Sequence, residues 1–523
     1  MKNTNEPKRV IGLFSLILSG IICIIGSGWL FGIGAAAKMA GPAAIFSWII
    51  CGIAVMIIAL TIAELGAMFP KSGGMVHYMY ESHGDMAGFF SAWINFLGIA
   101  PVIATEALAS IQYLSSWHFP WTKGLFNNAT GDLTTSGLFA TSLLLLVYFL
   151  LNYWSFKFFI KFMSFVTCLK IFTPLFTIIS LIVVAFHDRN FTVVNNTIAP
   201  YGWDAVLTAI PACGIIYSFN GFQTPVNLAG EVKNPGRNIP IALICSIAFC
   251  LIIYTGLHVA FIGALSPSEL IKGWNGISMG SPFAQLAITL NLNVLLLFIY
   301  LDVFVSPSGV GLTYFTTTSR MLYGMSHNNQ MPKYLGKLNP KYGIPRGALW
   351  TVLIICFIFL FFFRGWQQFA AVLSVAETIT YISGPIALMA LRKSRPNAER
   401  LFRLPFANFI CAVAFIICGL FLHWGTWPLS GEVILLGLSG FIFYIYYQNK
   451  AGWNSLFQQF KSSLWLIMFL VVAAINSYLG SKEFGGIGFI SAGWDNLVVC
   501  ITSLLFYFWG INSYYRKDNN KIA

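Results

Sequence analysis

A glycine-serine-glycine run, Gly26-Ser27-Gly28, interrupts the first apolar stretch of the sequence. Glycine weakens a helix, so a break here would leave backbone N–H and C=O groups without intrahelical partners. The positive end of a half-helix attracts a carboxylate, and free carbonyls can accept from an ammonium group. Ser27 and Gly28 are therefore candidates for holding a carboxylate, the carbonyl of Ile24 is a candidate for an amine, and Gly26 belongs to the same predicted binding segment. Alternatively, the glycines only let neighbouring helices pack closely.

A second interruption, Tyr217-Ser218-Phe219-Asn220-Gly221-Phe222, lies in the sixth apolar stretch, five stretches after the first. Matching breaks in two halves of a membrane protein are typical of inverted repeats that hold a ligand near the bilayer midplane. The pairing favours binding over packing. It makes Tyr217, Ser218, Asn220 and Gly221 further candidate binding residues.

Four of the ionisable residues within apolar stretches are candidates for a functional role, namely Lys170, Asp302, Glu377 and Glu106. Charged groups are costly inside a membrane, so each is a functional hypothesis. Burial penalises the charged form of Lys170, so we predict that it exchanges a proton, and Asp302 could pair with it. The alternatives are a lysine that reaches the membrane surface and carboxylates that only hydrogen-bond to neighbouring helices.

The elements that position these residues are membrane spans. The chain is 57% hydrophobic and only 9% charged, far below the roughly 25% charged residues of soluble domains. Fourteen apolar stretches approach the length of about 20 residues that a span requires. They are residues 11–36, 42–66, 87–115, 136–156, 159–186, 204–229, 241–263, 286–325, 347–363, 367–391, 405–423, 427–447, 462–480 and 496–515.

The basic residues orient these spans. If the N-terminus is cytoplasmic, 23 of the 30 Lys and Arg residues fall in inside segments, six fall outside, and Lys170 lies within a span. Because cytoplasmic segments carry the excess of Lys and Arg, the sequence predicts an all-α protein with both termini cytoplasmic. The first span is expected to be retained rather than cleaved as a signal peptide.

Composition and motifs also exclude several classes of protein. The net charge of +13 is spread over short segments between spans, so no nucleic-acid surface is expected. The ten cysteines form no CxxC pair, and we expect neither a metal site nor a cofactor. No repeated pore filter and no HExxH, GxSxG or His/Asp cluster is present, which leaves a channel or a membrane enzyme as remote alternatives.

Several segments resemble the amino acid–polyamine–organocation superfamily, in chain order over spans 1 to 12. The similar segments are Gly26 to Phe31, Ala63-Glu64-Leu65-Gly66, Pro70 to Gly74 with Tyr78, Phe219 to Phe222, Glu231 to Pro240, Ser319 to Tyr323, and Met331-Pro332. The resemblance implies a LeuT-like fold with two inverted repeats of five helices, residues 11–186 and 204–391. Four accessory helices (405–515) and cytoplasmic ends (1–10 and 516–523) complete the expected organisation.

The resemblance also implies roles for individual residues. Tyr217 stands where an aromatic side chain closes over the substrate, and Lys170 stands where a lysine replaces sodium in sodium-independent members. Glu64, Glu231, Lys233, Arg237 and Arg320 belong to motifs of gates or cytoplasmic loops. Two positions depart from the pattern. Asn220 replaces an apolar residue and could contact substrate, whereas Gln223 replaces a glutamate, which argues against a proton role there.

The stretch from Asp302 to Tyr323 is most similar to a bacterial subgroup of aspartate–proton symporters. The expected function is therefore transport of an acidic or small neutral amino acid, coupled to protons, across the bacterial inner membrane. An amino-acid/amino-acid or amino-acid/amine antiporter would share the same site. No oligomeric state is predicted.

Overall fold

The computed structural model describes residues 9–69, 75–154, 158–327, 330–451 and 456–515. The motif residues Pro70 to Gly74, most of the predicted segment 1–10 and the whole of 516–523 lie outside these ranges. Within them the fold is almost wholly helical. The strands are the short antiparallel pair β1 (Phe126–Asn127) and β2 (Asp132–Leu133).

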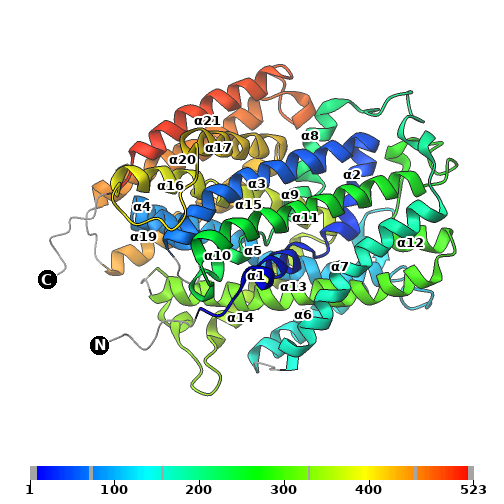
Figure 1. Cartoon of the computed structure of the whole chain (residues 1–523), viewed down its shortest axis with the longest axis horizontal. Coiled ribbons are helices and arrows are strands. Elements are labelled where there is room, and N and C mark those ends of the chain that lie inside the picture. The colour runs from blue at the N-terminus through cyan, green and yellow to red at the C-terminus, as the bar shows by residue number, and fades with distance from the viewer. Residues whose placement is uncertain (1–8, 70–74, 155–157, 328–329, 452–455, 516–523) are drawn as a thin grey trace.

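The first half of the chain supplies a broken helix and the long helices that surround it (Figure 1). These elements are α1 (Leu13–Ile24), α2 (Gly28–Ala40), α3 (Ala44–Met68), α4 (Met75–His83), α5 (Asp85–Leu114), α6 (Thr135–Tyr153) and α7 (Phe158–Val184).

The middle of the chain begins with a second broken helix. Its elements are α8 (Gly202–Ala212), α9 (Ile215–Ser218), α10 (Thr224–Asn227), α11 (Pro235–Ala264), α12 (Pro282–Thr289), α13 (Asn293–His327), α14 (Arg346–Phe362), α15 (Trp366–Tyr381) and α16 (Ser383–Ser394). The last part adds α17 (Ala407–Trp424), α18 (Leu429–Leu438), α19 (Gly440–Ala451), α20 (Leu456–Leu479) and α21 (Trp494–Asn512).

Single-turn 3₁₀ helices connect several of these elements. They are η1 (Gly41–Ala43), η2 (Asp188–Phe191), η3 (Ala229–Glu231), η4 (Trp274–Gly276), η5 (Lys333–Gly336) and η6 (Lys482–Phe484).

Eleven helical stretches in the described residues are long and apolar enough to cross a membrane, with α2 to α3, α15 to α16, and α18 to α19 each counted as one. The helices α1 and α14 are apolar but shorter, and the predicted span 204–229 is divided into α8, α9 and α10. The chain is thus a polytopic helical membrane protein. The count of fourteen crossings and the cytoplasmic position of the termini stay predictions.

One predicted span has a different internal structure from the one expected. The span 286–325, predicted as one long helix, begins within the separate short α12, and the long helix α13 starts only at Asn293. Asn291, between them, has a positive φ of 55°, which an α-helix cannot continue through. The spans 367–391 and 427–447, by contrast, continue through the boundary residues Ile382 and Ser439, whose backbone conformation is helical.

Burial divides the helices into a centre and a periphery. The apolar windows of α5 and of α15–α16 are 100% buried, whereas those of α6 and α7 are 28% and 33% buried. Large apolar side chains such as Phe139 and Val183 are exposed on the peripheral helices. A surface of this kind requires lipid as its solvent.

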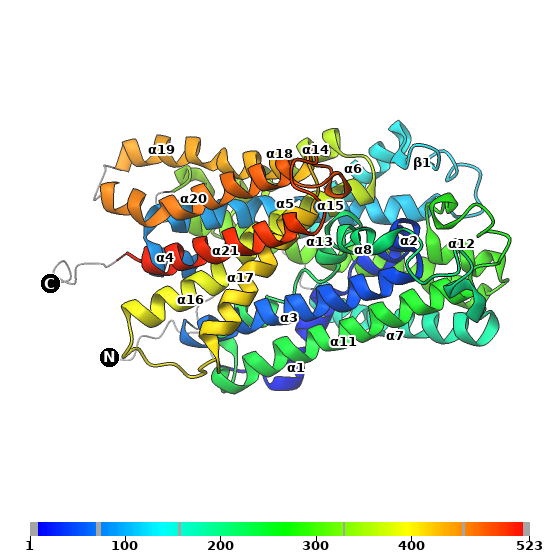
Figure 2. The same ribbon diagram turned by 90° about the horizontal axis from the view of Figure 1, so that it is seen from above.

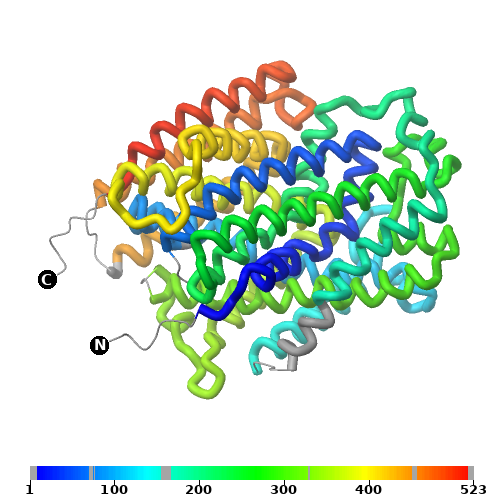
Figure 3. Tube along the Cα trace, viewed as in Figure 1, coloured from blue at the N-terminus to red at the C-terminus, as the bar shows by residue number. Residues whose placement is uncertain are grey.

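The helices run along the long axis of the molecule, and both ends of the described chain lie at the same end of the bundle (Figures 1 and 2). We call this the termini end. Figure 3 follows the chain from α1 through its interruption into α2, with α1 beside α11. The broken helix is therefore placed between long helices on several sides, where its unpaired backbone groups meet protein rather than lipid.

Candidate functional site

The first break lies where the sequence predicted it. Helix α1 ends at Ile24 and α2 begins at Gly28, with Ile25 in an extended conformation between them. The C-terminal end of one half-helix and the N-terminal end of the other therefore occur in the interior of the protein. Such ends carry opposite partial charges. Gly28 permits the approach of a neighbouring segment, because a Cβ there would lie 2.4 Å from Ser218 Oγ and 2.8 Å from its Cα.

The second break separates α9 from α10 and contacts the first. Gly221 in this break has a φ of 98°, and a Cβ on it would lie 2.5 Å from the carbonyl oxygen of Cys23. Both its conformation and its close contact with α1 require glycine. Gly214, just before α9, adopts the left-handed conformation (φ 70°) and interrupts the same segment once more.

Glu106 of α5 occupies the positive end of α2. Its carboxylate accepts hydrogen bonds from the backbone N–H of Ser27 (3.1 Å to Oε2) and from Ser27 Oγ (3.0 Å to Oε1). The hydroxyl of Tyr217 donates to the same Oε1 at 2.6 Å. Glu106 is 1% exposed. An internal carboxylate thus binds the group that the sequence assigned to a ligand's carboxylate.

Other backbone groups of the first break remain open. Among the described residues, the N–H groups of Gly26 and Gly28 have no hydrogen-bond acceptor. The carbonyl of Ile24 accepts from the hydroxyl of Tyr254 at 3.1 Å, and its second lone pair stays free for another donor. Of the two residues predicted to hold a carboxylate, Ser27 has its N–H bonded to Glu106, whereas the N–H of Gly28 stays available, as does that of Gly26.

Lys170 of α7 occupies the negative end of α1. Its ammonium group donates to the carbonyls of Ile22 and Ile25, both at 2.9 Å, and the residue is fully buried. Cations are stabilised at a helix C-terminus by the unpaired carbonyls and the helix dipole. This geometry excludes the alternative in which the side chain reaches the membrane surface.

Asp302 of α13 does not pair with Lys170, contrary to the possibility left open from the sequence. The side chain is fully buried, and neither carboxyl oxygen has a hydrogen-bond partner among the described residues. The reason is that the carbonyls of Ile22 and Ile25 take up Lys170 instead. A buried carboxyl group without partners is stable only when it carries a proton or has water beside it.

Asn220 links the second break to α15. Its side-chain amide donates to Glu377 Oε1 at 2.8 Å, and its Oδ1 accepts from the N–H of Gly221 and from Gln223 Nε2. Oε2 of Glu377 has no partner in the described structure. The two departures from the family pattern, Asn220 and Gln223, thus bond to each other.

A small cavity brings most of the predicted binding residues together. Its predicted members are Ile24, Gly26, Gly28, Glu106, Tyr217, Ser218 and Asn220, and it is completed by Cys23, Val102, Val310 and Tyr314. Its volume is about 10 Å³, which is room for about one water molecule. An amino acid could enter only if these side chains moved apart.

Trp366, at the start of α15, also contacts Ser27 and was not among the predicted site residues. Its indole N–H donates to Ser27 Oγ at 2.8 Å. Its ring stacks on Phe31 (centroids 5.0 Å apart) and meets Tyr217 edge-on (5.9 Å). The predicted span 367–391 began one residue too late to include it. A tryptophan at the end of a span usually lies at the membrane interface, whereas Trp366 is buried against Ser27.

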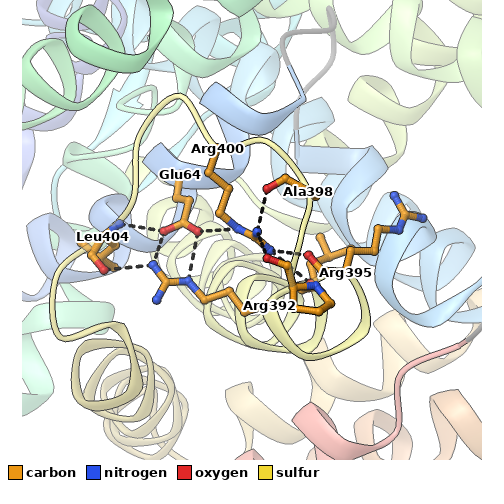
Figure 4. Close-up of polar contacts among 8 residues, drawn as sticks. Glu64, Arg392, Arg395, Ala398, Arg400 and Leu404 are labelled. Atoms are coloured by element: carbon orange, nitrogen blue, oxygen red, sulfur yellow. Dashed lines mark hydrogen bonds and ion pairs between the residues drawn. The ribbon is translucent and has the colours of Figure 1, made fainter.

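A separate cluster of charges lies at the termini end (Figure 4). Glu64 of α3, fully buried, accepts from Arg392 Nε at 3.0 Å and from Arg392 Nη2, and its Oε1 lies 3.2 Å from Arg400 Nε. The backbone N–H of Leu404 adds a further hydrogen bond at 2.7 Å. One carboxylate therefore joins α3, α16 and the loop that follows α16.

The other predicted gate residues do not join this cluster. The side chains of Glu231, Lys233, Arg237 and Arg320 form no ion pair within the described residues. The backbone at Glu231 and Lys233 instead pairs with Val10 and Ile11 ahead of α1. These backbone hydrogen bonds hold the segment that leads into α1 against the loop before α11. Arg392 and Arg400 were not predicted, because nothing in a basic loop marks which arginine reaches a buried glutamate.

Comparison with known proteins identifies the family. A family model described as amino acid permease matches residues 10–444. The glutamate/serine transporter AimA of Bacillus subtilis (strain 168) is 48% identical over 99% of this chain and 96% of its own length.

Two further relatives come from the same organism. The aspartate-proton symporter is 36% identical over 97% of both chains, and the serine/threonine exchanger SteT is 25% identical over 86% of this chain and 99% of its own. All these relatives are transporters, not enzymes. The chain therefore belongs to the amino acid permeases of the amino acid–polyamine–organocation superfamily.

Proposed function

We propose that this permease imports an acidic or small neutral amino acid together with protons, by alternating access across the bacterial inner membrane. The observation that carries the proposal is that internal charges bind both ends of the broken first helix. Lys170 of α7 binds the C-terminal end of α1, and Glu106 of α5 binds the N-terminal end of α2. The printed functions of the relatives, glutamate/serine transport and aspartate-proton symport, support the substrate class and the proton.

The substrate site lies between the two breaks. The free N–H groups of Gly26 and Gly28 suit the α-carboxylate, because they lie at the positive end of α2. The carbonyls of Ile24 and Ser218 suit the α-ammonium group. Tyr217 lies between this site and Trp366. Movement of the Tyr217 side chain would therefore open the site toward Trp366.

Proton coupling follows from the position of Glu106. A substrate carboxylate on Gly26 and Gly28 would lie beside the carboxylate that already binds Ser27. Two adjacent carboxylates repel each other, which favours protonation of Glu106 when substrate binds. Thermodynamic linkage makes the effect reciprocal, so a proton taken up from outside favours substrate binding. Lys170, Glu377 and Asp302 are the further proton-carrying candidates around this site.

The scaffold for this cycle would be the two five-helix repeats, 11–186 and 204–391, with the helices of 405–515 as accessories. A LeuT-like arrangement places both broken helices at the interface of the repeats. Movement of one group of helices against the other would then expose the site to each side in turn.

The test uses purified protein in proteoliposomes with an imposed pH gradient, inside alkaline. Wild-type protein should accumulate labelled glutamate, aspartate or serine, and a protonophore should abolish the accumulation. Lys170→Ala should lose the dependence on the pH gradient, because the carbonyls of Ile22 and Ile25 lose their titratable partner. Lys272→Ala, at an exposed loop lysine, is the matched control. Undiminished gradient-driven uptake by Lys170→Ala would reject its role.

Amino-acid exchange is the second candidate function, favoured by the similarity to the serine/threonine exchanger. It predicts that uptake requires amino acid inside the vesicles and ignores the pH gradient. Counterflow in vesicles preloaded with serine or glutamate separates the two functions.

A further inference from the structure

A second cavity lies outside the central site. Its volume is about 140 Å³, an order of magnitude more than the central cavity. It is bounded by the C-terminal half of α2, the end of α5, the loop around β1 and β2, the segment before α12 and the start of α15. These segments lie at the end of the bundle opposite the termini (Figures 1 and 2). We call it the outer cavity.

Trp366 separates the outer cavity from the central one. Its ring and that of Phe31 line the outer cavity, while its indole N–H reaches Ser27, between the two glycines that line the central cavity. A molecule in the outer cavity would therefore rest on the Trp366–Phe31 stack, directly above the first break.

The polar groups of the outer cavity match an amino acid of net negative charge. Lys38 is the one charged residue that lines it, and this exposed side chain forms no ion pair with any residue that the structure describes. Gln112 is 6% exposed. Its Nε2 donates to the carbonyl of Gly280 at 3.0 Å, which leaves Oε1 as a buried acceptor without a partner.

An acceptor left unpaired in a cavity favours a ligand with a donor, and an unpaired ammonium group favours a carboxylate. The side-chain amide of Asn128, on the same wall, can donate to a second carboxylate. A cationic amino acid would instead be repelled by Lys38.

We propose that the outer cavity is a second substrate site. In it, Lys38 binds the side-chain carboxylate of an acidic amino acid, and Gln112 Oε1 accepts a hydrogen bond from the α-ammonium group of the same molecule. The site captures the substrate before Trp366 moves and passes it to the central break. The proposal rests on the proposed transport of amino acids and deepens it, because it assigns the preference for acidic substrates to Lys38.

Binding of radiolabelled L-glutamate to the purified full-length chain in nanodiscs tests this site directly. Gly28→Leu fills the central site, since even a Cβ there would meet Ser218. We expect the wild type to bind two glutamate molecules per protein and Gly28→Leu to bind one. The double variant Gly28→Leu with Lys38→Gln should bind none. Loss of all binding in Gly28→Leu alone, with the protein folded, overturns the proposal, as does full binding by the double variant.

Transport by the otherwise unchanged chain gives an independent test that does not depend on Gly28→Leu folding. Lys38→Gln should raise KM for glutamate about five- to tenfold with kcat unchanged and should weaken the dependence of KM on ionic strength. KM for serine should change less than about twofold, because serine carries no side-chain charge for Lys38 to attract. Lys272→Gln is the control, an exposed lysine that does not line the outer cavity.

Equal KM values for glutamate in the wild type and in Lys38→Gln overturn the second site while leaving amino-acid transport intact. Absence of uptake of any amino acid by the wild type would overturn both proposals. The two failures are therefore distinguishable in one assay.

Discussion

At the scale of single residues, the unusual feature is that a buried ammonium group and a buried carboxylate, the two charged groups that every amino acid carries, bind the two ends of the first helix break. The ammonium group of Lys170 binds carbonyls of α1, and the carboxylate of Glu106 binds the amide of Ser27 at the start of α2. Each satisfies backbone groups that a helix break would otherwise leave unpaired inside the membrane. These internal interactions are of the same chemical kind as those proposed for the substrate, but they use the neighbouring backbone groups of the break.

Glu106→Gln tests the proposed coupling at this scale. The amide keeps the size of the side chain and an oxygen that can accept from Ser27 and Tyr217, but it cannot take up a proton. We expect glutamate counterflow to persist, while accumulation driven by a pH gradient falls at least about tenfold. The measurement is uptake into proteoliposomes with and without the gradient.

Glu432→Gln, at an exposed position on α18, controls for the loss of a carboxylate elsewhere. Gradient-driven accumulation by Glu106→Gln at the wild-type level would remove Glu106 from the coupling.

Residues of this kind could be predicted from the sequence only in part. Lys170 and Glu106 stand out as charges in apolar stretches, but their partners lie 145 and 79 positions away, at Ile25 and Ser27. No local pattern encodes such contacts. Trp366 joins Ser27 across 339 positions and looked like an ordinary aromatic residue at a span end. Local chemistry identifies candidates, and only tertiary packing assigns their partners.

At the scale of elements, the breaks themselves were predictable because glycine spacing is a local property. Gly28 and Gly221 are each required by a close contact with another segment, Ser218 and Cys23 respectively. The division between α12 and α13 was not predicted, because Asn291 and Asn293 are isolated polar residues in a stretch that is otherwise largely apolar. Hydropathy reports the length of an apolar stretch and not its continuity.

The cluster around Glu64 is the clearest link between elements at the termini end. It ties α3 to α16 and to the loop at Leu404, so any cycle that opens this end must separate these elements or move them together. Glu64→Gln should lower stability by about 3–5 kcal/mol, because it removes the buried charge that pairs with two partly buried guanidinium groups. Thermal unfolding of the purified protein measures the effect.

A second ion pair at the same end supplies the matched control. Arg395 bonds to Glu81 at 2.9 Å, and their side chains are 39% and 23% exposed. Glu81→Gln should cost less than about 1 kcal/mol, because a solvated pair contributes little. Similar destabilisation by the two variants would show that burial of Glu64 does not set the strength of the cluster.

At the scale of the whole molecule, the arrangement of the ends carries a prediction about topology. Both ends of the described chain lie at the same end of the bundle, as an even number of crossings requires. We expect a green fluorescent protein fused at the C-terminus to fluoresce, since it folds in the cytoplasm. Alkaline phosphatase fused in the loop that contains Lys272 should be active and, after α13, inactive. The opposite pattern would invert the assignment of inside and outside.

The internal charges also bear on the kinetics of a full transport cycle. A strict exchanger needs an empty form that cannot reorient, so that each import requires an export. Here the central cavity has a volume of about 10 Å³, and Lys170 and Glu106 bind backbone groups at both ends of the break. Under the proposed symport, these internal partners stay with the broken helix during the return step, so the carrier needs no cargo on the way back and repeated turnover accumulates substrate.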